Sequence, residues 1–363
     1  MRQKKKEKKD QDPQEEEDAS SSSPPQEESL GLKSKMILGS AGRKAGLIAL
    51  CLASALISRS TAFALDKAAS RSLSHFIMGV FYDNLGQADL AIQEYKRSLK
   101  SDSKNSLTHL TLASTYIKKN DMQEARKELE SAIRLDPSAV EPHAILALVY
   151  SSLNNQQSAA GEYEIALKNA SKISPGNADI YKTLGLIYIK QKKFAEALDA
   201  YKTALKISPA DPQIYFFMAN VYDETGSRND AEECLKKAIE LKPDYHEALN
   251  YLGYLYAESG TNLDNAESMI GKALQMQPDN GAYLDSLAWV HFKKGKVSQA
   301  LGELEKASAL YEDPVIYEHL GDVYLKLGEK SKALSNWERS YNLDPGQADV
   351  RKKIEDIKKN AGS

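Results

Sequence analysis

Several features that would assign this 363-residue chain to a functional class are scarce. It has two cysteines, Cys51 and Cys234, and only Cys234 lies in the regularly patterned part of the chain. A single thiol forms no internal disulfide, so the cysteine count indicates neither an oxidising nor a reducing compartment. The uncharged apolar run at residues 45–57 has 13 residues. That is short for a membrane span, which needs about 20 residues.

A basic excess is also absent. From residue 65 to the end, the chain has 37 lysines and arginines against 42 aspartates and glutamates. A nucleic-acid-binding protein is expected to carry a basic face, so the composition argues against nucleic acid as a partner. The one basic cluster, residues 2–9, is followed at once by an acidic run at residues 10–18.

Motifs of catalysis are lacking as well. Residues 39–44 are rich in glycine but have neither the spacing of a phosphate-binding loop nor a preceding strand. Asp285, Ser286 and His291 contain the residue types of a hydrolase, yet no Gly-x-Ser-x-Gly turn surrounds Ser286, and all three lie on one predicted helix. The sequence therefore predicts a protein that is not an enzyme and that uses no cofactor.

Three histidines raise the question of a metal site. His75, His109 and His143 are spaced 34 residues apart, so each occupies the same position in a repeated unit. Packed helices lie about 8 to 10 Å apart, whereas ligands of one zinc ion lie about 2 Å from the metal. We therefore expect packing histidines and no metal site.

What the chain does have is a repeat. A small residue recurs about every 34 positions, at Ala91, Ala125, Ala159, Ala197, Ala231, Ala266, Ala300 and Ala333. An aromatic residue or histidine precedes most of these alanines by nine positions, as Tyr188 precedes Ala197. Such a period indicates that one supersecondary unit is stacked on copies of itself, because a single unit cannot bury its own apolar face.

The fourth copy has the most complete pattern, with Tyr181, Leu184, Gly185 and Tyr188 followed by Ala197, Tyr201 and Pro209. This pattern resembles the tetratricopeptide repeat. The first four residues share one face of a first helix, and the next share one face of a second. The resemblance implies an all-α, right-handed superhelical solenoid of about eight helix-turn-helix repeats, closed by a carboxyl-terminal capping helix.

We place the repeat array at residues 65–347, with the capping helix and tail at residues 348–363. The eight units are predicted at residues 72–105, 106–139, 140–177, 178–211, 212–245, 246–280, 281–313 and 314–347. The third unit has about four extra residues around residues 169–174, which would lengthen its second helix or its exit loop. The sixth has one extra residue at 259–263, so its internal turn should bulge.

The amino-terminal part, residues 1–64, lies outside the repeat pattern. Residues 1–35 are charged and nearly devoid of apolar side chains, and we expect them to be disordered. Residues 36–64 have a basic flank, an apolar core and an Ala-x-Ala ending, which are the parts of a secretory signal peptide cleaved after Ala64. Met36 is then an alternative start. The other hypotheses are an uncleaved anchor, with membrane association through residues 45–64, a cytoplasmic protein, or lipid modification of Cys51. Cleavage of a signal peptide would place the protein outside the cytoplasm, in the periplasm of a bacterial cell.

The resemblance also implies a concave groove lined by the first helices, with repeat positions 2, 5, 9 and 12 pointing into it. In repeats five to seven these positions include Phe216, Asn220, Asp223, Asn250, Tyr254, Asp285, Trp289 and Phe292. Aromatic, amide and carboxylate groups suit capture of an extended peptide. We therefore expect a scaffold that binds a protein or peptide partner. The alternatives are that Tyr254 and Trp289 pack between helices, or that the groove holds a glycan or a lipid of an export machine. The sequence indicates no oligomeric state.

Overall fold

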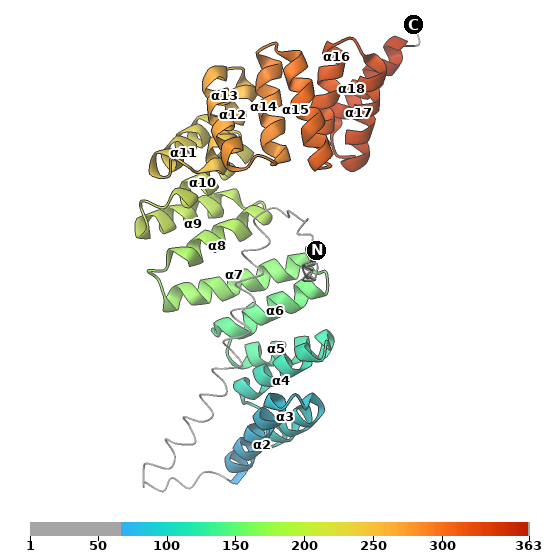
Figure 1. Ribbon diagram of the computed structural model, residues 1–363. Coiled ribbons are helices and arrows are strands. Elements are labelled where there is room, and N and C mark those ends of the chain that lie inside the picture. The colour runs from blue at the N-terminus through green and yellow to red at the C-terminus, as the bar shows by residue number, and fades with distance from the viewer. Residues whose placement is uncertain (1–66, 362–363) are drawn as a thin grey trace, which may run out of the picture. The chain divides into compact units, whose positions relative to one another are not determined.

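The computed structural model describes residues 67–361, and all regular secondary structure between these residues is α-helical (Figure 1). The helices are α2 (Lys67–Asn84), α3 (Ala88–Ser101), α4 (Ser106–Lys118), α5 (Met122–Leu135), α6 (Val140–Ser152), α7 (Gln156–Ile173), α8 (Ala178–Lys190), α9 (Phe194–Ile207), α10 (Pro212–Glu224), α11 (Arg228–Leu241), α12 (His246–Ser259), α13 (Leu263–Met276), α14 (Gly281–Lys293), α15 (Val297–Leu310), α16 (Pro314–Lys326), α17 (Lys330–Leu343) and α18 (Ala348–Ala361). The predicted all-α repeat fold is confirmed.

The chain divides within α6 into two compact units. The first contains the described residues up to 137 together with 148–155, and the second contains residues 138–147 and those from 156 onward. In the first unit α2 packs on α3, α3 on α4, and α4 on α5. In the second unit the same alternation continues from α7 to α18, and the helices form a stack of antiparallel pairs (Figure 1).

Short polar side chains start many of the helices. The N-cap residues Asn105, Asp121, Asn177, Asp211, Asn280 and Asp313 each accept a hydrogen bond from a backbone N–H of the first turn. These N–H groups have no partner within the helix, so each cap contributes about 1 kcal/mol. Pro212 and Pro314 occupy first-turn positions, where the missing N–H costs nothing.

The turn inside each repeat contains a left-handed residue. Gly86, Gly226, Gly295 and Gly328 have this conformation, and Asn120, Asn154 and Lys192 adopt it at the equivalent positions. In repeat six the turn has two such residues, Gly260 and Asn262, at the place of the extra residue. The additional residues of repeat three extend α7 to 18 residues, whereas α9 and α11 have 14.

Small residues bring the two helices of a repeat together. A Cβ atom added at Gly79, Gly185, Gly253 or Gly321 would lie 2.3–2.6 Å from a side chain of the second helix. The facing side chains are Tyr95, Tyr201, Ile270 and Trp337. Because nothing larger than hydrogen fits there, each glycine is required by the close approach of a large side chain.

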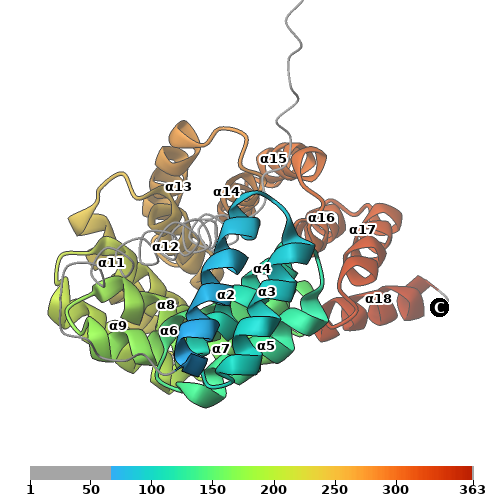
Figure 2. The same ribbon diagram turned by 90° about the horizontal axis from the view of Figure 1, so that it is seen from below.

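The last helix covers the carboxyl end of the stack. Val350 and Ile357 of α18 are buried against Ala333 and Trp337 of α17. Figure 2, which views the molecule from below, shows α16, α17 and α18 packed together. The helix α18 therefore buries an apolar face that the last repeat would otherwise expose, as terminal repeats of a solenoid require.

Two predictions concern parts of the chain that lie outside the described residues. These are the disordered tail at residues 1–35 and the signal peptide or anchor at residues 36–64, and both stay predictions. Between residues 67 and 361 no helix has the length and the apolar composition that a membrane span requires.

Candidate binding surface on the first helices

The predicted site residues lie on α10, α12 and α14. We call these three helices, together with α16, the first-helix surface. The helices are neighbours in the second unit: α14 packs against both α12 and α16, and Phe216 of α10 contacts Tyr251 of α12 with ring centroids 6.1 Å apart. Side chains from successive repeats therefore meet along this surface.

The repeat-five residues are tied to neighbouring side chains and backbone. The ring of Phe216 lies against Tyr245, with centroids 5.3 Å apart. The Nδ2 atom of Asn220 donates a hydrogen bond of 2.8 Å to the carbonyl oxygen of Phe216. The hydroxyl of Tyr251 donates a hydrogen bond of 2.7 Å to Asp223. These groups are positioned by contacts within the protein.

The two repeat-six residues are half-buried. Tyr254 packs against the apolar cluster formed by α10–α14. Burial, and then the nearby carboxylates of Glu258 and Asp285, raise the pKa of Tyr254 well above its ordinary value. The Oδ1 atom of Asn250 is enclosed and accepts no hydrogen bond from the part of the chain that the structure describes. An unmet buried acceptor costs about 1–3 kcal/mol, so Asn250 is the residue of the predicted site that would gain most from an added donor.

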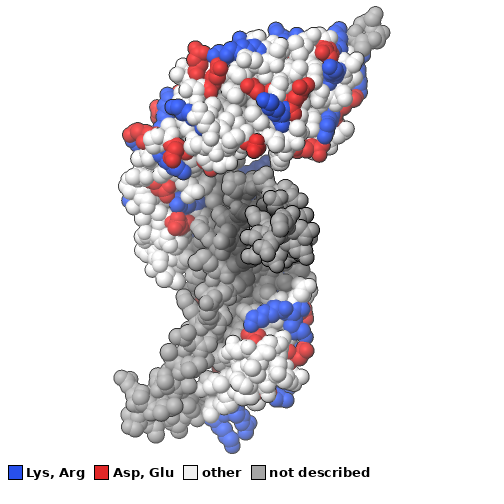
Figure 3. Space-filling model, in the orientation of Figure 1, with Lys and Arg blue, Asp and Glu red and all other residues white. Residues whose placement is uncertain are grey.

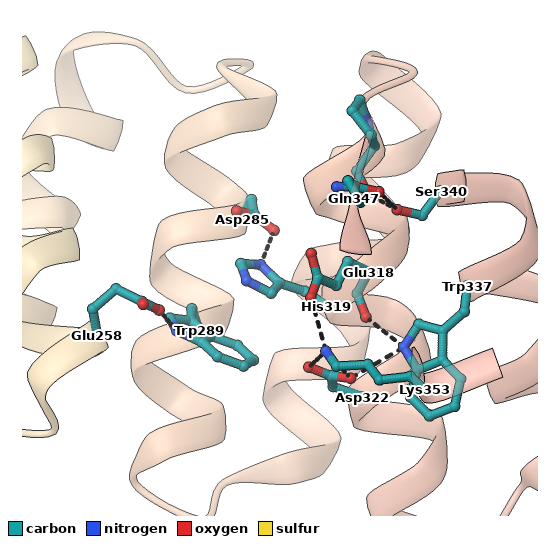
Figure 4. A network of polar contacts seen from close by, with 11 residues as sticks. Glu258, Asp285, Trp289, Glu318, His319, Asp322, Trp337, Ser340, Gln347 and Lys353 are labelled. Carbon is teal, nitrogen blue, oxygen red and sulfur yellow. Dashed lines mark hydrogen bonds and ion pairs between the residues drawn. The ribbon is translucent and has the colours of Figure 1, made fainter. Parts of the chain in front are cut away.

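Trp289 is the centre of a stacked cluster in repeat seven (Figure 4). Its ring is parallel to that of His319, with centroids 4.0 Å apart, and to that of Phe292, with centroids 5.0 Å apart. Its Nε1 atom donates a hydrogen bond to Glu258 of α12. Trp289 is 8% exposed. In this structure it therefore links the first helices of three repeats as a packing residue, and its role in binding a partner stays a prediction.

His319 and Asp285 form a buried ion pair beside Trp289. The Nδ1 atom of His319 lies 2.8 Å from Oδ1 of Asp285, and both residues are buried. Burial by itself lowers the pKa of His319. The Asp285 carboxylate, with Asp322 and Glu318, more than offsets this effect, and the pKa lies above the ordinary 6.5. A protonated imidazole on Asp285 then faces the ring of Trp289, an arrangement that cation–π attraction stabilises.

Two further carboxylates lie on α16, next to this cluster. The Nζ atom of Lys353, on α18, lies 2.8 Å from Glu318 and 2.7 Å from Asp322. The Nε1 atom of Trp337 donates a hydrogen bond of 3.1 Å to Asp322 (Figure 4). Burial lowers the pKa of Lys353, but these two carboxylates raise it above its ordinary value. The cluster thus connects the capping helix to the first-helix surface.

The structure brings the predicted site residues together in two groups. Phe216 and Asp223 contact Tyr251, and Asn220 bonds the backbone of Phe216. Trp289 stacks on Phe292 and on His319, and His319 pairs with Asp285. Sequence reasoning missed Glu258, His319, Glu318 and Asp322. Glu318 and Asp322 occupy repeat positions 5 and 9 of repeat eight, so extending the same positional rule by one repeat would have found them.

The histidines of the first three repeats each have a partner within their own repeat. His75, His109 and His143 lie 2.6 Å from Glu94, Glu128 and Glu162, respectively. Each glutamate follows its histidine by 19 positions, a constant spacing that the sequence already contained. Among residues 67–361 no group of three histidine, cysteine, aspartate or glutamate side chains is arranged to hold a metal ion.

Asp285, Ser286 and His291, which contain the residue types of a hydrolase, each form hydrogen bonds or ion pairs with different groups. The hydroxyl of Ser286 donates a hydrogen bond of 2.9 Å to the carbonyl oxygen of Ala282. His291 lies between Glu303, at 2.7 Å, and Glu267, at 3.2 Å. Asp285 pairs with a different histidine, as described above. Ser286, His291 and Asp285 are therefore not arranged as a nucleophile, base and orienting carboxylate.

The His319–Asp285 pair predicts a pH-dependent contribution to stability. Because the pKa of His319 is raised on folding, the contribution is fully present below the unfolded value of about 6.5 and is lost as the pH rises through the folded value. His319→Gln should therefore lower the free energy of unfolding more at pH 6 than at pH 9. Urea denaturation of both proteins at the two pH values measures this.

His246→Gln is the control, since His246 is a half-buried histidine of α12 whose ring nitrogen lies 2.8 Å from the hydroxyl of Tyr283. A loss that is equal at both pH values would contradict the assignment.

Comparison with known protein families assigns the chain to a family. The family described as the Cilia and flagella-associated protein 70 C-terminal domain, a tetratricopeptide repeat domain, matches residues 45–282, more than half of the chain. The chain belongs to this tetratricopeptide repeat family. The general Tetratricopeptide repeat family matches residues 286–348 as well. The family match begins at residue 45 and thus includes the apolar run that precedes α2.

Curated relatives resemble the chain over short stretches. A TPR repeat-containing protein of Methanocaldococcus jannaschii is 35% identical over 82 residues, which are 22% of this chain and 14% of that protein. Another from Pseudomonas aeruginosa is 36% identical over 62 residues, 17% of this chain and 10% of that protein. The chain therefore matches well under two thirds of the length of either relative.

Solved structures share the fold. The crystal structure of a tetratricopeptide repeat protein from Parabacteroides merdae superimposes with a TM-score of 0.56 at 18% identity, over 69% of this chain and 98% of that one. A chain of the APC/C hetero-tetramer Cut9-Hcn1 superimposes with a TM-score of 0.52 at 15% identity, over 90% and 77%. At these identities the likeness shows the tetratricopeptide solenoid and nothing about partners. Tetratricopeptide repeats are in general scaffolds that bind other proteins.

Proposed function

We propose that the chain is a non-catalytic scaffold and that its first-helix surface binds an extended segment of a partner protein that carries lysine or arginine residues. The observation that carries the proposal is the accumulation of carboxylates on α10–α16. Asp223, Glu247, Glu258, Glu318 and Asp322 lie half-buried on these first helices. Lys353 pairs with the last two, Arg228 lies 3.9 Å from Asp223, and His246 lies 3.2 Å from Glu247. Half-buried carboxylates bind cationic groups more strongly than exposed ones, because water screens them less.

The rest of the surface supports this choice of partner. On the face of the second unit that Figure 3 shows, acidic and basic side chains are interspersed, and neither sign forms an extended patch on that face. Specificity would come from the first-helix surface. Its amides, Asn220 and Asn250, would bond the partner backbone, and its partly buried aromatic residues Phe216, Tyr254 and Phe292 would pack its side chains. A glycan or lipid ligand has less support, because half-buried carboxylates are suited to a cationic partner.

A peptide-display selection on the immobilised full chain tests the proposal. We expect the selected peptides to be enriched in lysine and arginine. A variant carrying Asp223→Asn, Glu247→Gln and Glu258→Gln should bind them at least tenfold more weakly, since each substitution removes a charge while keeping the shape of the side chain. The measurement is titration calorimetry of the selected peptides at two salt concentrations, with weaker binding expected at the higher one.

The matched control removes three carboxylates from other parts of the second unit. Glu240, Glu312 and Glu329 have exposed side chains and lie outside the first helices. Replacing all three by glutamine changes the net charge equally and should alter the affinity less than twofold. Equal weakening by the two triple variants would mean that net charge alone governs binding. Selected peptides without basic residues would overturn the assignment of the partner class.

A further inference from the structure

The first repeat exposes an apolar face on α2. Ile77 is 41% exposed, Met78 40% and Phe81 53%, and Leu85, the first residue after α2, is 56% exposed. The spacing of the first three places them on one side of the helix, and the backbone N–H of Leu85 bonds the carbonyl oxygen of Phe81 and continues that side. We call these four residues the open face of α2. Contiguous exposed apolar residues on a soluble domain mark a surface that another group covers.

Other repeats show what normally covers this face. Met78 and Phe81 occupy the positions that Leu320 and Val323 have in α16. In α16 both residues are buried, in one cluster with Leu304 and other residues of the preceding helix pair, α14 and α15. The same two positions are buried as Leu112 and Thr115, Leu184 and Ile187, Met218 and Val221, and Leu252 and Leu255. The open face of α2 is therefore a repeat-to-repeat packing face without its preceding helix.

The segment directly upstream has the composition and the position of such a helix. Residues 45–57 are uncharged and mostly apolar. A helix that ended at residue 62 would leave four residues before α2 begins at Lys67. Four residues also separate α3, which ends at Ser101, from α4, which begins at Ser106. The match to the repeat family starts at residue 45, so the family domain includes this segment.

We propose that residues 45–62 are an amino-terminal cap that packs on the open face of α2. The segment then takes the place of the second helix of a preceding repeat and closes the array at its amino end, as α18 does at the other end. This inference competes with the sequence-based hypotheses of a cleaved signal peptide and a membrane anchor for the same residues. It does not depend on the first-helix surface, since α2 and the segment belong to the other end of the array.

Hydrogen exchange on the full chain tests the cap. We expect the chain purified from a bacterial host to be soluble, to keep residues 45–64 by intact mass, and to show slow amide exchange at residues 46–62. Phe81→Glu places a charge on the open face and should speed exchange in that segment at least tenfold. Leu85→Glu is a second variant on the same face with the same expected result, in case one of them fails to fold.

Leu310→Glu is the matched control, because Leu310 is 51% exposed and lies on α15, which belongs to the second unit. It should leave exchange at residues 46–62 unchanged. A chain that starts at Leu65 overturns the proposal in favour of signal cleavage. Partitioning into vesicles of phosphatidylethanolamine and phosphatidylglycerol overturns it in favour of an anchor. Fast exchange in the unmodified protein, no response to either glutamate variant, or protection that appears only in a dimer by sedimentation also overturns it.

Discussion

Replacing Gly185 by alanine is expected to lower the free energy of unfolding of the second unit by about 1–3 kcal/mol, the usual cost of overpacking a core. The added Cβ atom would lie 2.4 Å from two ring carbons of Tyr201. Tyr201 is fully buried, so its ring has no free space into which it can move. In an ordinary helix the same substitution stabilises the fold, by up to about 1 kcal/mol. The sign of the effect therefore reports the close approach of α8 and α9.

Gly271→Ala is the control for this prediction. Gly271 lies within α13, and a Cβ atom added there would meet nothing within 4 Å. We expect this variant to be as stable as the unmodified chain or slightly more stable. Urea denaturation followed by circular dichroism measures both. Stabilisation by both substitutions would show that the Gly185–Tyr201 contact is absent from the folded protein.

The destabilisation caused by Gly185→Ala should also be confined to nearby repeats. In a solenoid each repeat contacts only its neighbours, so destabilisation spreads by nearest-neighbour coupling. Native-state hydrogen exchange should therefore accelerate first in α8 and α9, and least in α17 and α18. Uniform acceleration would indicate that the second unit unfolds as a single cooperative block.

The repeat architecture was predictable because it depends on spacing alone. Periodic small residues such as Ala197 and Gly185 predict where two helices cross, and the structure places large side chains of the facing helix against the glycines. In every repeat except the sixth, the turn has one left-handed residue at a constant position, as at Gly226 and Lys192. Local rules of this kind do not require knowledge of any other repeat.

The contacts of the candidate site could not be predicted in the same way. The positional rule places Trp289 on the inner side of α14, but it does not say what the next repeat presents to it. The covering ring comes from His319, at a position that the rule does not count, and the acceptor for the indole N–H is Glu258 on the opposite side. Which residues contact Trp289 depends on the side-chain conformations of three helices. The pattern of a single helix contains no information about these conformations.

Trp289→Ala should therefore act first on stability. Truncating a buried tryptophan typically costs about 3–5 kcal/mol, because the lost contacts leave a cavity. Here it would also remove the ring between Phe292 and His319 and leave the half-buried Glu258 without its donor. We expect the midpoint of urea denaturation to fall strongly, and hydrogen exchange to accelerate in α12, α14 and α16 together, because the indole joins these helices.

Trp289→Phe separates packing from binding. Phenylalanine keeps a ring that can stack on His319 but loses the donor to Glu258, so the expected loss is about 1 kcal/mol, typical of one hydrogen bond. Peptides selected on the unmodified chain should bind Trp289→Phe with little change, and their weaker binding to Trp289→Ala should track the unfolded fraction. A tenfold loss of affinity in a fully folded Trp289→Phe protein would contradict this. It would mean that the indole leaves its stacked position to contact the partner, and that the binding surface forms only when Trp289 and His319 separate.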